Sequence, residues 1–268
     1  MAVRQIFPVA ADGGLIGPLA PGGPGLAEIA RLYAYPAAAA RPGRPWVRAN
    51  FVASADGAAS AQGRSGGLSG AADRQVFSVL RSLADVILAG AGTVRAEKYA
   101  PVRGREAWAG LRQGRAPTPP IAVVTRLLGL AADSPLLAAA PPHARTIVLT
   151  TDAAPADRRA AAARHADVVV AGDALLSPEA IIGALAERGH WRILVEGGPR
   201  LLGQIAAAGL LDELCLTVSP LLAGGQADRI LAPPGGDDIP AAQASLCLAH
   251  VLEDSGFLLC RYVRKDAS

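Results

Sequence analysis

The sequence predicts a three-layer α/β domain whose central sheet is mostly parallel but mixed, with helices on both faces. Short apolar runs of strand type alternate with segments of helical periodicity, the order that produces a doubly covered parallel sheet. Glycine-rich turns follow directly on several of these runs. The last two apolar runs, at 245–252 and 257–263, are joined by a short polar turn and predict a C-terminal antiparallel hairpin.

The first 45 residues differ in composition from the rest of the chain. They are rich in alanine, proline and glycine, and only the stretch 26–35 has the pattern of a short helix. We expect residues 1–45 to form an N-terminal extension that packs across the surface of the main domain. The first convincing strand pattern is at 46–53, so the main domain is predicted to span residues 46–268.

The main domain then alternates strands and helices. Ser69 and Ser177 are expected to be N-caps, because a serine before an apolar periodic segment is a helix start signal. Further helices are expected at 155–165 and from Pro199 onward, where proline suits the first helical turn. The remaining strands are expected at 84–89, 119–125, 146–151, 167–171 and 193–195.

Composition and charge exclude several classes of function. The net charge is +3 and no dense basic run exists, so nucleic-acid binding is not predicted. No apolar run approaches the roughly 20 residues that a membrane span needs. The cysteines, Cys215, Cys247 and Cys260, lie in apolar runs without metal-ligand spacing. They predict a reducing, cytoplasmic location and no metal.

Polar or glycine-rich turns follow four of the predicted strands, at 54–57, 90–93, 125–126 and 196–198. If the strands are parallel, these turns share the sheet edge where ligands bind in open α/β folds. Glycines at a helix N-terminus expose N–H groups that suit an anion. Neither glycine turn is GxGxxG and Walker A is absent, which excludes a standard Rossmann motif. The alternative is that these glycines only allow the chain to turn.

Several motifs in order carry a resemblance to a known family. They are Asn50 with SADG at 54–57, VILAGAGTV at 86–94, ILVEGG at 193–198 and DELCLTVSPLLAGG at 212–225. In this order and spacing the chain resembles the pyrimidine reductase domain of riboflavin biosynthesis, from about residue 46 to the C-terminus. The resemblance implies a dihydrofolate-reductase-like fold for residues 46–268, a homodimer, and NADPH as hydride donor.

The resemblance also implies which residues hold the cofactor. Arg126 suits the adenosine 2′-phosphate, because the guanidinium N–H fork matches phosphate oxygens, although a solvated charge at a strand end is the alternative. The implied cofactor-binding residues are Gly90, Gly92, Thr93, Thr125, Arg126, Glu196, Gly197, Gly198 and Leu201.

The implied reaction reduces 5-amino-6-(5-phosphoribosylamino)uracil, with hydride transfer to the imine carbon of the open sugar. Asp56 and Glu196 are the candidate catalytic residues, because the imine nitrogen needs a proton and no histidine lies near the implied site. The alternatives are an ordinary turn role for Asp56 and local backbone hydrogen bonds for Glu196. The implied substrate-binding residues are Asn50, Ser54, Asp56, Ser65, Lys98 and Arg103.

One segment departs from the family pattern. Where the family usually has Asp-Asp-Pro, this chain has Glu97-Lys98-Tyr99, which puts an ammonium at a carboxylate position and is expected to reverse the local charge. This leaves two alternatives: a dihydrofolate or pterin reductase of the same fold, and a non-catalytic NADPH-binding protein. The zinc deaminase signature of the bifunctional enzymes is absent from the sequence.

Overall fold

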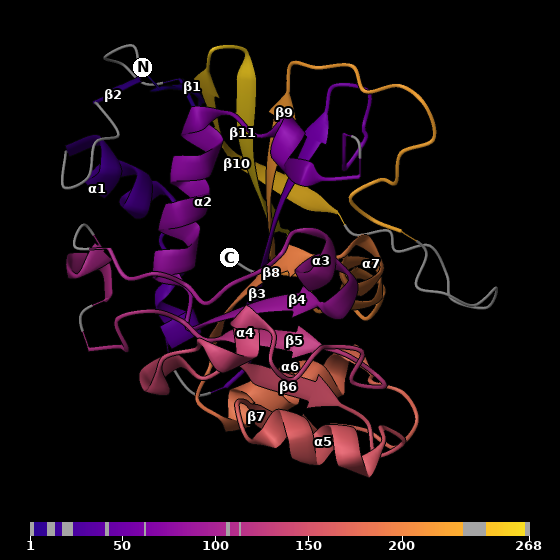
Figure 1. Ribbon diagram of the computed structural model, residues 1–268. Coiled ribbons are helices and arrows are strands. Elements are labelled where there is room, and N and C mark those ends of the chain that lie inside the picture. Colours follow the sequence, from indigo (N-terminus) through magenta and orange to yellow (C-terminus); the bar gives the residue numbers. More distant parts are fainter. Residues whose placement is uncertain are drawn as a thin grey trace.

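A computed structural model shows one eleven-stranded sheet with the strand order β2-β1-β10-β11-β9-β3-β8-β4-β5-β6-β7 (Figure 1). The predicted α/β class with a mostly parallel, mixed sheet is confirmed. The structure describes residues 3–9, 14–17, 24–40, 43–61, 63–105, 108–112, 114–232 and 245–265.

One half of the sheet is parallel and carries its carboxyl ends at a single edge. Strand β8 pairs in parallel with β3 on one side and β4 on the other, and β5, β6 and β7 follow outward. The bounds are β3 Trp46–Ser54, β4 Val86–Gly90, β5 Ile121–Val124, β6 Ile147–Thr150, β7 Asp167–Val170 and β8 Arg192–Gly197.

The other half of the sheet is antiparallel. Strand β9 (Glu213–Ser219) runs parallel to β3 and pairs antiparallel with β11 (Phe257–Arg264). Strand β10 (Leu246–Asp254) pairs with β11 and confirms the predicted hairpin. The N-terminal segment adds β1 (Val3–Phe7) and β2 (Leu15–Ile16) beyond β10. It therefore extends the sheet itself, whereas the sequence indicates only packing across the surface of the main domain.

Helices cover both faces of the sheet. Along β4, Ile87 and Ala89 pack into a core with α1 and α2, whereas Val86 and Leu88 pack into a second core with α6 and α7. This alternation follows from the two-residue period of a strand that is buried on both faces. The helices are α1 Pro24–Leu32, α2 Ala71–Leu83, α3 Ala91–Ala96, α4 Pro135–Ala138, α5 Ala156–Ala163, α6 Pro178–Glu187 and α7 Pro199–Ala207.

One predicted N-cap is confirmed, and two other details of the helix starts differ from the sequence predictions. Ser177 caps α6, and its hydroxyl accepts a hydrogen bond from the backbone N–H of Ala180 at 3.1 Å. Ser69 does not cap α2. The N-cap is Gly70, because the Ser69 hydroxyl donates to the Asp73 carboxylate instead. The expected loop at 90–93 is also shorter, since α3 begins at Ala91 directly after β4.

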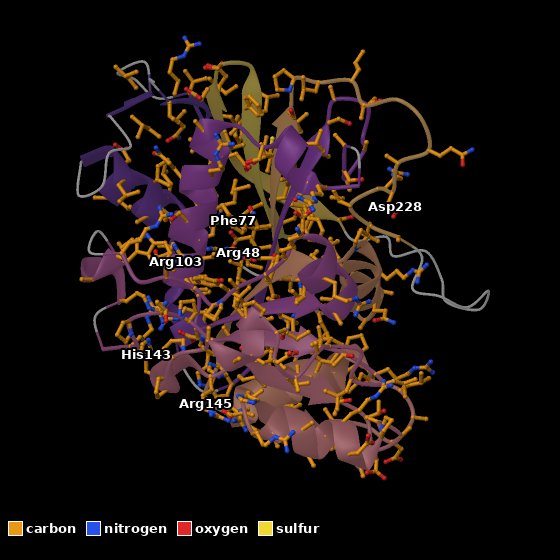
Figure 2. The ribbon with its side chains drawn as sticks, in the orientation of Figure 1. Arg48, Phe77, Arg103, His143, Arg145 and Asp228 are labelled. Carbon is orange, nitrogen blue, oxygen red and sulfur yellow. The ribbon has the colours of Figure 1, made fainter. Side chains whose placement is uncertain are left out.

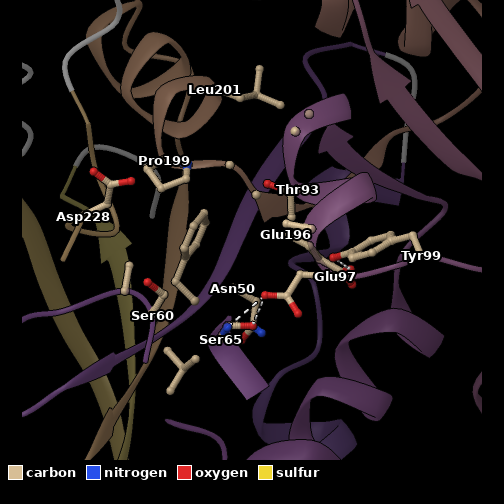
Figure 3. Close-up of a pocket in the computed structure, with 18 of the residues that line it drawn as sticks. Asn50, Ser60, Ser65, Thr93, Glu97, Tyr99, Glu196, Pro199, Leu201 and Asp228 are labelled. Carbon is tan, nitrogen blue, oxygen red and sulfur yellow. Dashed lines mark hydrogen bonds between the residues drawn. The ribbon is translucent and has the colours of Figure 1, made fainter. Parts of the chain in front are cut away.

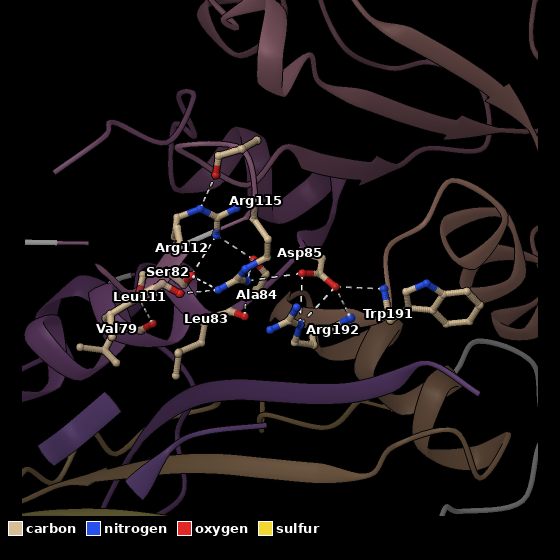
Figure 4. Close-up of polar contacts among 11 residues, drawn as sticks. Val79, Ser82, Leu83, Ala84, Asp85, Leu111, Arg112, Arg115, Trp191 and Arg192 are labelled. Atoms are coloured by element: carbon tan, nitrogen blue, oxygen red, sulfur yellow. Dashed lines mark hydrogen bonds and ion pairs between the residues drawn. The ribbon is translucent and has the colours of Figure 1, made fainter. Parts of the chain in front are cut away.

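A polar cluster fixes the junction between α2 and the parallel strands (Figure 4). Arg112 and Arg115 donate to the carbonyls at the C-terminal end of α2, including the Ala84 carbonyl at 2.8 and 3.1 Å. The Asp85 carboxylate accepts from the backbone N–H groups of Trp191 and Arg192, at 3.1 and 2.9 Å. These bonds satisfy helix-end carbonyls and hold the start of β8 beside β4.

Within the described part of the chain, no helix is both long and apolar enough to cross a membrane. The same residues hold no group of three or more His, Cys, Asp or Glu side chains arranged to bind a metal ion.

Candidate active site

A cavity of about 1110 Å³ lies at the carboxyl ends of β3, β4, β5 and β8 (Figure 3). This volume is slightly above the usual range for small-molecule sites, roughly 300–1,000 Å³, and is large enough for a nucleotide and a second ligand. Phe77 on α2 and Asp228 on the segment after β9 line it from two sides (Figure 2). The turns predicted to share one sheet edge at 90–93 and 196–198 meet in this cavity.

Seven of the implied cofactor-binding residues line the cavity. The two glycine turns pack against each other through Thr93. A Cβ built on Gly197 would lie 2.8 Å from the Thr93 Cγ2, and one on Gly198 would lie 2.7 Å from the Thr93 Oγ1. Glycine is therefore required here for the close approach of the β8–α7 turn to α3. The seven lining residues are Gly90, Gly92, Thr93, Glu196, Gly197, Gly198 and Leu201.

The cavity has the features of an anion site. The N-terminus of α7 begins at Pro199, directly after the two glycines, and its first N–H groups have no partner within the helix. Arg74, Arg95 and Arg200 are exposed residues that line the same cavity. A Cβ on Gly92 would meet no atom within 4 Å, so the space beside this residue is open. These features fit a ligand with several phosphate groups.

Thr125 and Arg126 do not line the cavity, although Val124 before them does. The Thr125 hydroxyl accepts from the backbone N–H of Gly129 at 3.2 Å. The Arg126 carbonyl accepts from the hydroxyls of Thr150 and Thr151, and its side chain is exposed. Both residues therefore lie just beyond the cavity, at the end of β5.

Only some of the implied substrate-binding residues line the cavity. Asn50 and Ser65 line the cavity, whereas Ser54, Asp56, Lys98 and Arg103 do not. Lys98 is exposed and has a positive φ of 52°, and the cavity is lined instead by its neighbours Glu97 and Tyr99. The charge reversal that the sequence indicates at Lys98 thus falls outside the cavity, which keeps a carboxylate at Glu97.

Asp56 is part of a turn that holds the segment after β9. Its carboxylate accepts from the Ser54 hydroxyl and from the backbone N–H groups of Ala223 and Gly224, at 3.0 and 2.8 Å. The hydrogen bond from Ser54, followed by those from the two backbone N–H groups, lowers the pKa of Asp56 to about 2. A carboxylate so bound is a poor proton donor at neutral pH.

Glu196 is buried and is the centre of a triad with Arg81 and Tyr99, which are half-buried. Arg81 donates through Nε and Nη2 to the two carboxylate oxygens at 2.7 and 2.6 Å, and the Tyr99 hydroxyl donates to Oε2 at 2.9 Å. The guanidinium also lies 4.3 Å from the ring centroid of Phe77. Burial, with the Glu196 charge added to it, raises the pKa of Tyr99 well above its usual value, so the phenol stays protonated.

Besides Glu196 and Asp228, two more carboxylates line the cavity. Asp73 is buried and accepts from the hydroxyls of Ser69 and Thr217, at 2.5 and 2.6 Å. Glu97 is half-buried, and its Oε1 accepts from both the backbone N–H and the hydroxyl of Ser65, at 2.8 and 3.0 Å. These contacts fix both side chains at the cavity wall.

A family model described as the RibD C-terminal domain matches residues 45–255. The chain belongs to this family. The family match supports the resemblance found in the sequence, because it covers the same motifs.

Relatives of this chain carry reductase names. This chain is 27% identical to the 2,5-diamino-6-ribosylamino-4(3H)-pyrimidinone 5′-phosphate reductase of Methanothermobacter thermautotrophicus, over 73% of this chain and 87% of the relative. The protein of the same name from Archaeoglobus fulgidus is 29% identical, over 68% and 84%. A solved pyrimidine reductase-like protein from Corynebacterium diphtheriae has a TM-score of 0.77 at 26% identity, covering 88% and 98%.

Sequence reasoning missed several residues that line the cavity or contact its wall. Arg81 lies 115 positions from Glu196, and nothing in the spacing on α2 predicts their contact. Tyr99 and Glu97 stand in the segment that departs from the family pattern, so that departure was the available signal. The sequence does not distinguish Asp73 as a site residue, because a carboxylate in the first turn of a helix is common. The cavity-lining Arg74, Arg95 and Arg200 carry no distinguishing pattern.

Proposed function

We propose that this protein is an NADPH-dependent reductase of a ribosylaminopyrimidine phosphate in riboflavin biosynthesis. The observation that carries the proposal is the cavity itself, where two glycine turns meet at Thr93 beside the N-terminus of α7. The chain covers 87% and 84% of two relatives that are named reductases. Their names support the same reaction class. A homodimeric state and a cytoplasmic location stay predictions from the sequence.

The residues present fit a nicotinamide dinucleotide phosphate. Gly92 leaves open space at the cavity wall, the α7 N-terminus offers backbone N–H donors, and Arg95 and Arg200 supply positive charge. We assign Arg126 to the 2′-phosphate, since it is exposed and follows the cavity-lining Val124, the last residue of β5, by two positions. When bound, NADPH supplies a hydride for the imine carbon of the opened sugar.

The protein's own part in this reaction is alignment and exclusion of water. Glu196 has both oxygens bound by Arg81 and Tyr99, so we assign it to positioning of the β8–α7 turn rather than to proton donation. Asp56 holds the segment after β9 along the cavity edge through Ala223 and Gly224. Asn50 and Ser65 are assigned to contacts with the substrate, because both line the cavity.

The test is a turnover assay with purified protein. Loss of nicotinamide absorbance is followed with NADPH and, in separate reactions, with ribosylaminopyrimidine phosphates and dihydrofolate. We expect turnover with a ribosylaminopyrimidine phosphate alone. Turnover with dihydrofolate alone would favour the pterin alternative, and tight NADPH binding without any turnover would favour a non-catalytic protein.

A second assay addresses the choice between NADPH and NADH. Arg126→Ala is expected to weaken NADPH binding more than NADH binding, because the 2′-phosphate is present only in NADPH. Dissociation constants for both nucleotides are measured by calorimetry. An equal loss of affinity for NADPH and NADH would show that Arg126 does not bind the 2′-phosphate.

A further inference from the structure

The three exposed arginines that line the cavity come from different elements. Arg95 on α3 and Arg200 on α7 belong to the helices that follow the two glycine turns. Arg95 also donates to the Gly129 carbonyl at 2.9 Å, in the segment after β5. Arg74 is separate from both, because it lies near the start of α2. It is the cavity-lining arginine that the proposed function has not yet used.

The cavity has two sides that suit two ligands. Figure 3 shows Thr93, Pro199 and Leu201 on one side, and Ser60 and Ser65 on the other. The first side carries the glycine turns and the N-terminus of α7, which we assign to the nucleotide. The second side is therefore left for the pyrimidine substrate.

The contacts of Arg74 place it on this second side. Its Nη1 donates to the Ser69 carbonyl at 2.9 Å, and the Ser69 N–H donates to the Gly66 carbonyl at 3.4 Å. Gly66 lines the cavity, and a Cβ built on it would meet no atom within 4 Å. Open space therefore adjoins the loop to which Arg74 is bound.

The guanidinium of Arg74 keeps one edge available to an anion. Its Nε and Nη2 have no hydrogen-bond or ion-pair partner among the residues that the structure describes. Arg81 uses the same edge to bind both carboxylate oxygens of Glu196, at 2.7 and 2.6 Å. The fork of N–H donors matches phosphate oxygens as well as it matches a carboxylate. Arg74 thus offers a complete phosphate-binding edge beside the open space.

The chemistry of the proposed reaction separates the substrate phosphate from the nucleotide. Hydride reaches C1′ of the opened sugar, whereas the phosphate is on C5′, at the far end of the sugar chain. Like charges repel more strongly where water is excluded, so this phosphate is disfavoured beside the phosphates of the nucleotide. Arg103, which the sequence resemblance implies for substrate binding, does not line the cavity.

We propose that Arg74 binds the 5′-phosphate of the substrate through its Nε–Nη2 edge and selects the phosphorylated compound over its nucleoside. This inference rests on the proposed function, because it needs the pyrimidine substrate in the cavity beside the nucleotide. It assigns phosphate recognition to α2, an element for which neither the resemblance nor the turns at the strand ends indicate a site residue.

The test compares two values of kcat/KM. One is for the ribosylaminopyrimidine phosphate that the protein reduces, and the other is for the same compound without its phosphate. We expect the unaltered protein to prefer the phosphorylated compound at least about tenfold, the effect of a hydrogen bond to a charged group. Arg74→Met should lower this ratio about tenfold by raising KM for the phosphorylated compound, with kcat/KM for the nucleoside unchanged. Arg74→Lys keeps the charge but loses the fork, so it should give an intermediate ratio.

The matched control is Arg164→Met, the loss of an exposed arginine at the C-cap of α5 that does not line the cavity. It should leave the ratio unchanged. Thermal unfolding establishes that each variant is folded, and Arg74→Lys carries the test if Arg74→Met does not fold. Calorimetric titration should show the same NADPH affinity for Arg74→Met as for the unaltered protein.

Three results overturn this inference while the proposed function stands. They are equal reduction of the phosphorylated compound and the nucleoside, a ratio that Arg74→Met leaves unchanged, and a loss of NADPH affinity as large as the rise in KM. The last result would place Arg74 against the nucleotide instead. Reduction of neither compound overturns both the inference and the proposed function.

Discussion

Two arginine–glutamate groups at this sheet each contain a buried glutamate and differ in what surrounds them. The first, which we call the buried charge cluster, joins Arg48 on β3 and Arg261 on β11 to Glu213 on β9. The second is the triad of Arg81, Tyr99 and Glu196 beside the cavity. The chemistry of the two pairs is the same, so their roles must come from their environment.

The central pair of the buried charge cluster, Arg48 and Glu213, is fully enclosed, whereas Arg261 is partly exposed. The side chains of Arg48 and Glu213 are both 0% exposed, and Glu213 also accepts from the Trp46 indole at 3.0 Å. Burial alone would raise the pKa of Glu213, but the charges of Arg48 and then Arg261 outweigh it and lower that pKa. Neither Arg48 nor Glu213 lines the cavity, whereas Glu196 and Tyr99 do. We therefore expect the first group to stabilise the sheet and the second to act in the site.

The largest expected effect comes from breaking the buried charge cluster. Glu213→Gln leaves Arg48 buried without its counter-charge, so we expect the free energy of unfolding to fall by about 3–5 kcal/mol. Urea unfolding measures this change. The matched control is Glu253→Gln, whose partner Arg4 is 58% exposed and whose loss should change stability little. A fall as small as the control's would show that the cluster contributes no stability.

A second test uses the histidine that lies beside this cluster. His250 is 4% exposed and packs edge-on against Tyr33 at 4.6 Å between ring centroids. Burial, with the charge of Arg261, lowers its pKa from 6.5 to about 4. The unfolded chain therefore binds this proton more readily, and stability is full above pH 6.5 and declines toward pH 4.

The decline should reach roughly 3 kcal/mol, because each pKa unit is worth about 1.4 kcal/mol. Urea unfolding at several pH values measures it, with His250→Phe as the variant that keeps a ring and cannot titrate. We expect the variant to lose this part of the pH dependence. The same slope in both proteins would mean that His250 is not the group responsible.

A third test addresses the triad at the cavity. Tyr99→Phe removes one hydrogen bond to the Glu196 carboxylate, which positions the β8–α7 turn, so NADPH affinity and kcat/KM for the pyrimidine substrate should each fall by up to about tenfold. Steady-state kinetics and calorimetry separate the two quantities. Tyr262→Phe on β11 is the control. Lower stability with unaltered kinetics would show that the triad, like the buried charge cluster, only stabilises the fold.

The smallest expected effect concerns Asp56. Asp56→Asn should leave kcat near its original value but speed hydrogen exchange at the Ala223 and Gly224 amides, which lose a charged acceptor. Because the folded pKa is lowered to about 2, the original protein should keep this protection above pH 4 and lose it as the pH falls through 2. A large loss of kcat would instead indicate that Asp56 acts as a proton donor.

Much of the fold could be predicted from local patterns, but the contacts within the site could not. The apolar run at 193–195 and the glycines after it predict a buried strand and a sharp turn, because both follow from neighbouring residues. Arg81 reaches Glu196 only after α2 packs on β8, so no local pattern predicts it. The same applies to Asp56, whose partners Ala223 and Gly224 lie far along the chain. Lys98 was singled out by its charge, yet the backbone turns it away and presents Glu97 instead.

The central claim is that the cavity beside Gly92 holds the nicotinamide nucleotide. Gly92→Leu tests it directly, because a Cβ there meets no atom within 4 Å and the side chain would occupy the open space. Gly183→Leu on α6 is the matched control, a helical glycine that is equally open and outside the cavity. Calorimetric titration with NADPH should show at least about tenfold weaker binding for Gly92→Leu alone, the loss of about 1.4 kcal/mol or more. Unaltered NADPH affinity in a folded Gly92→Leu protein would contradict the account.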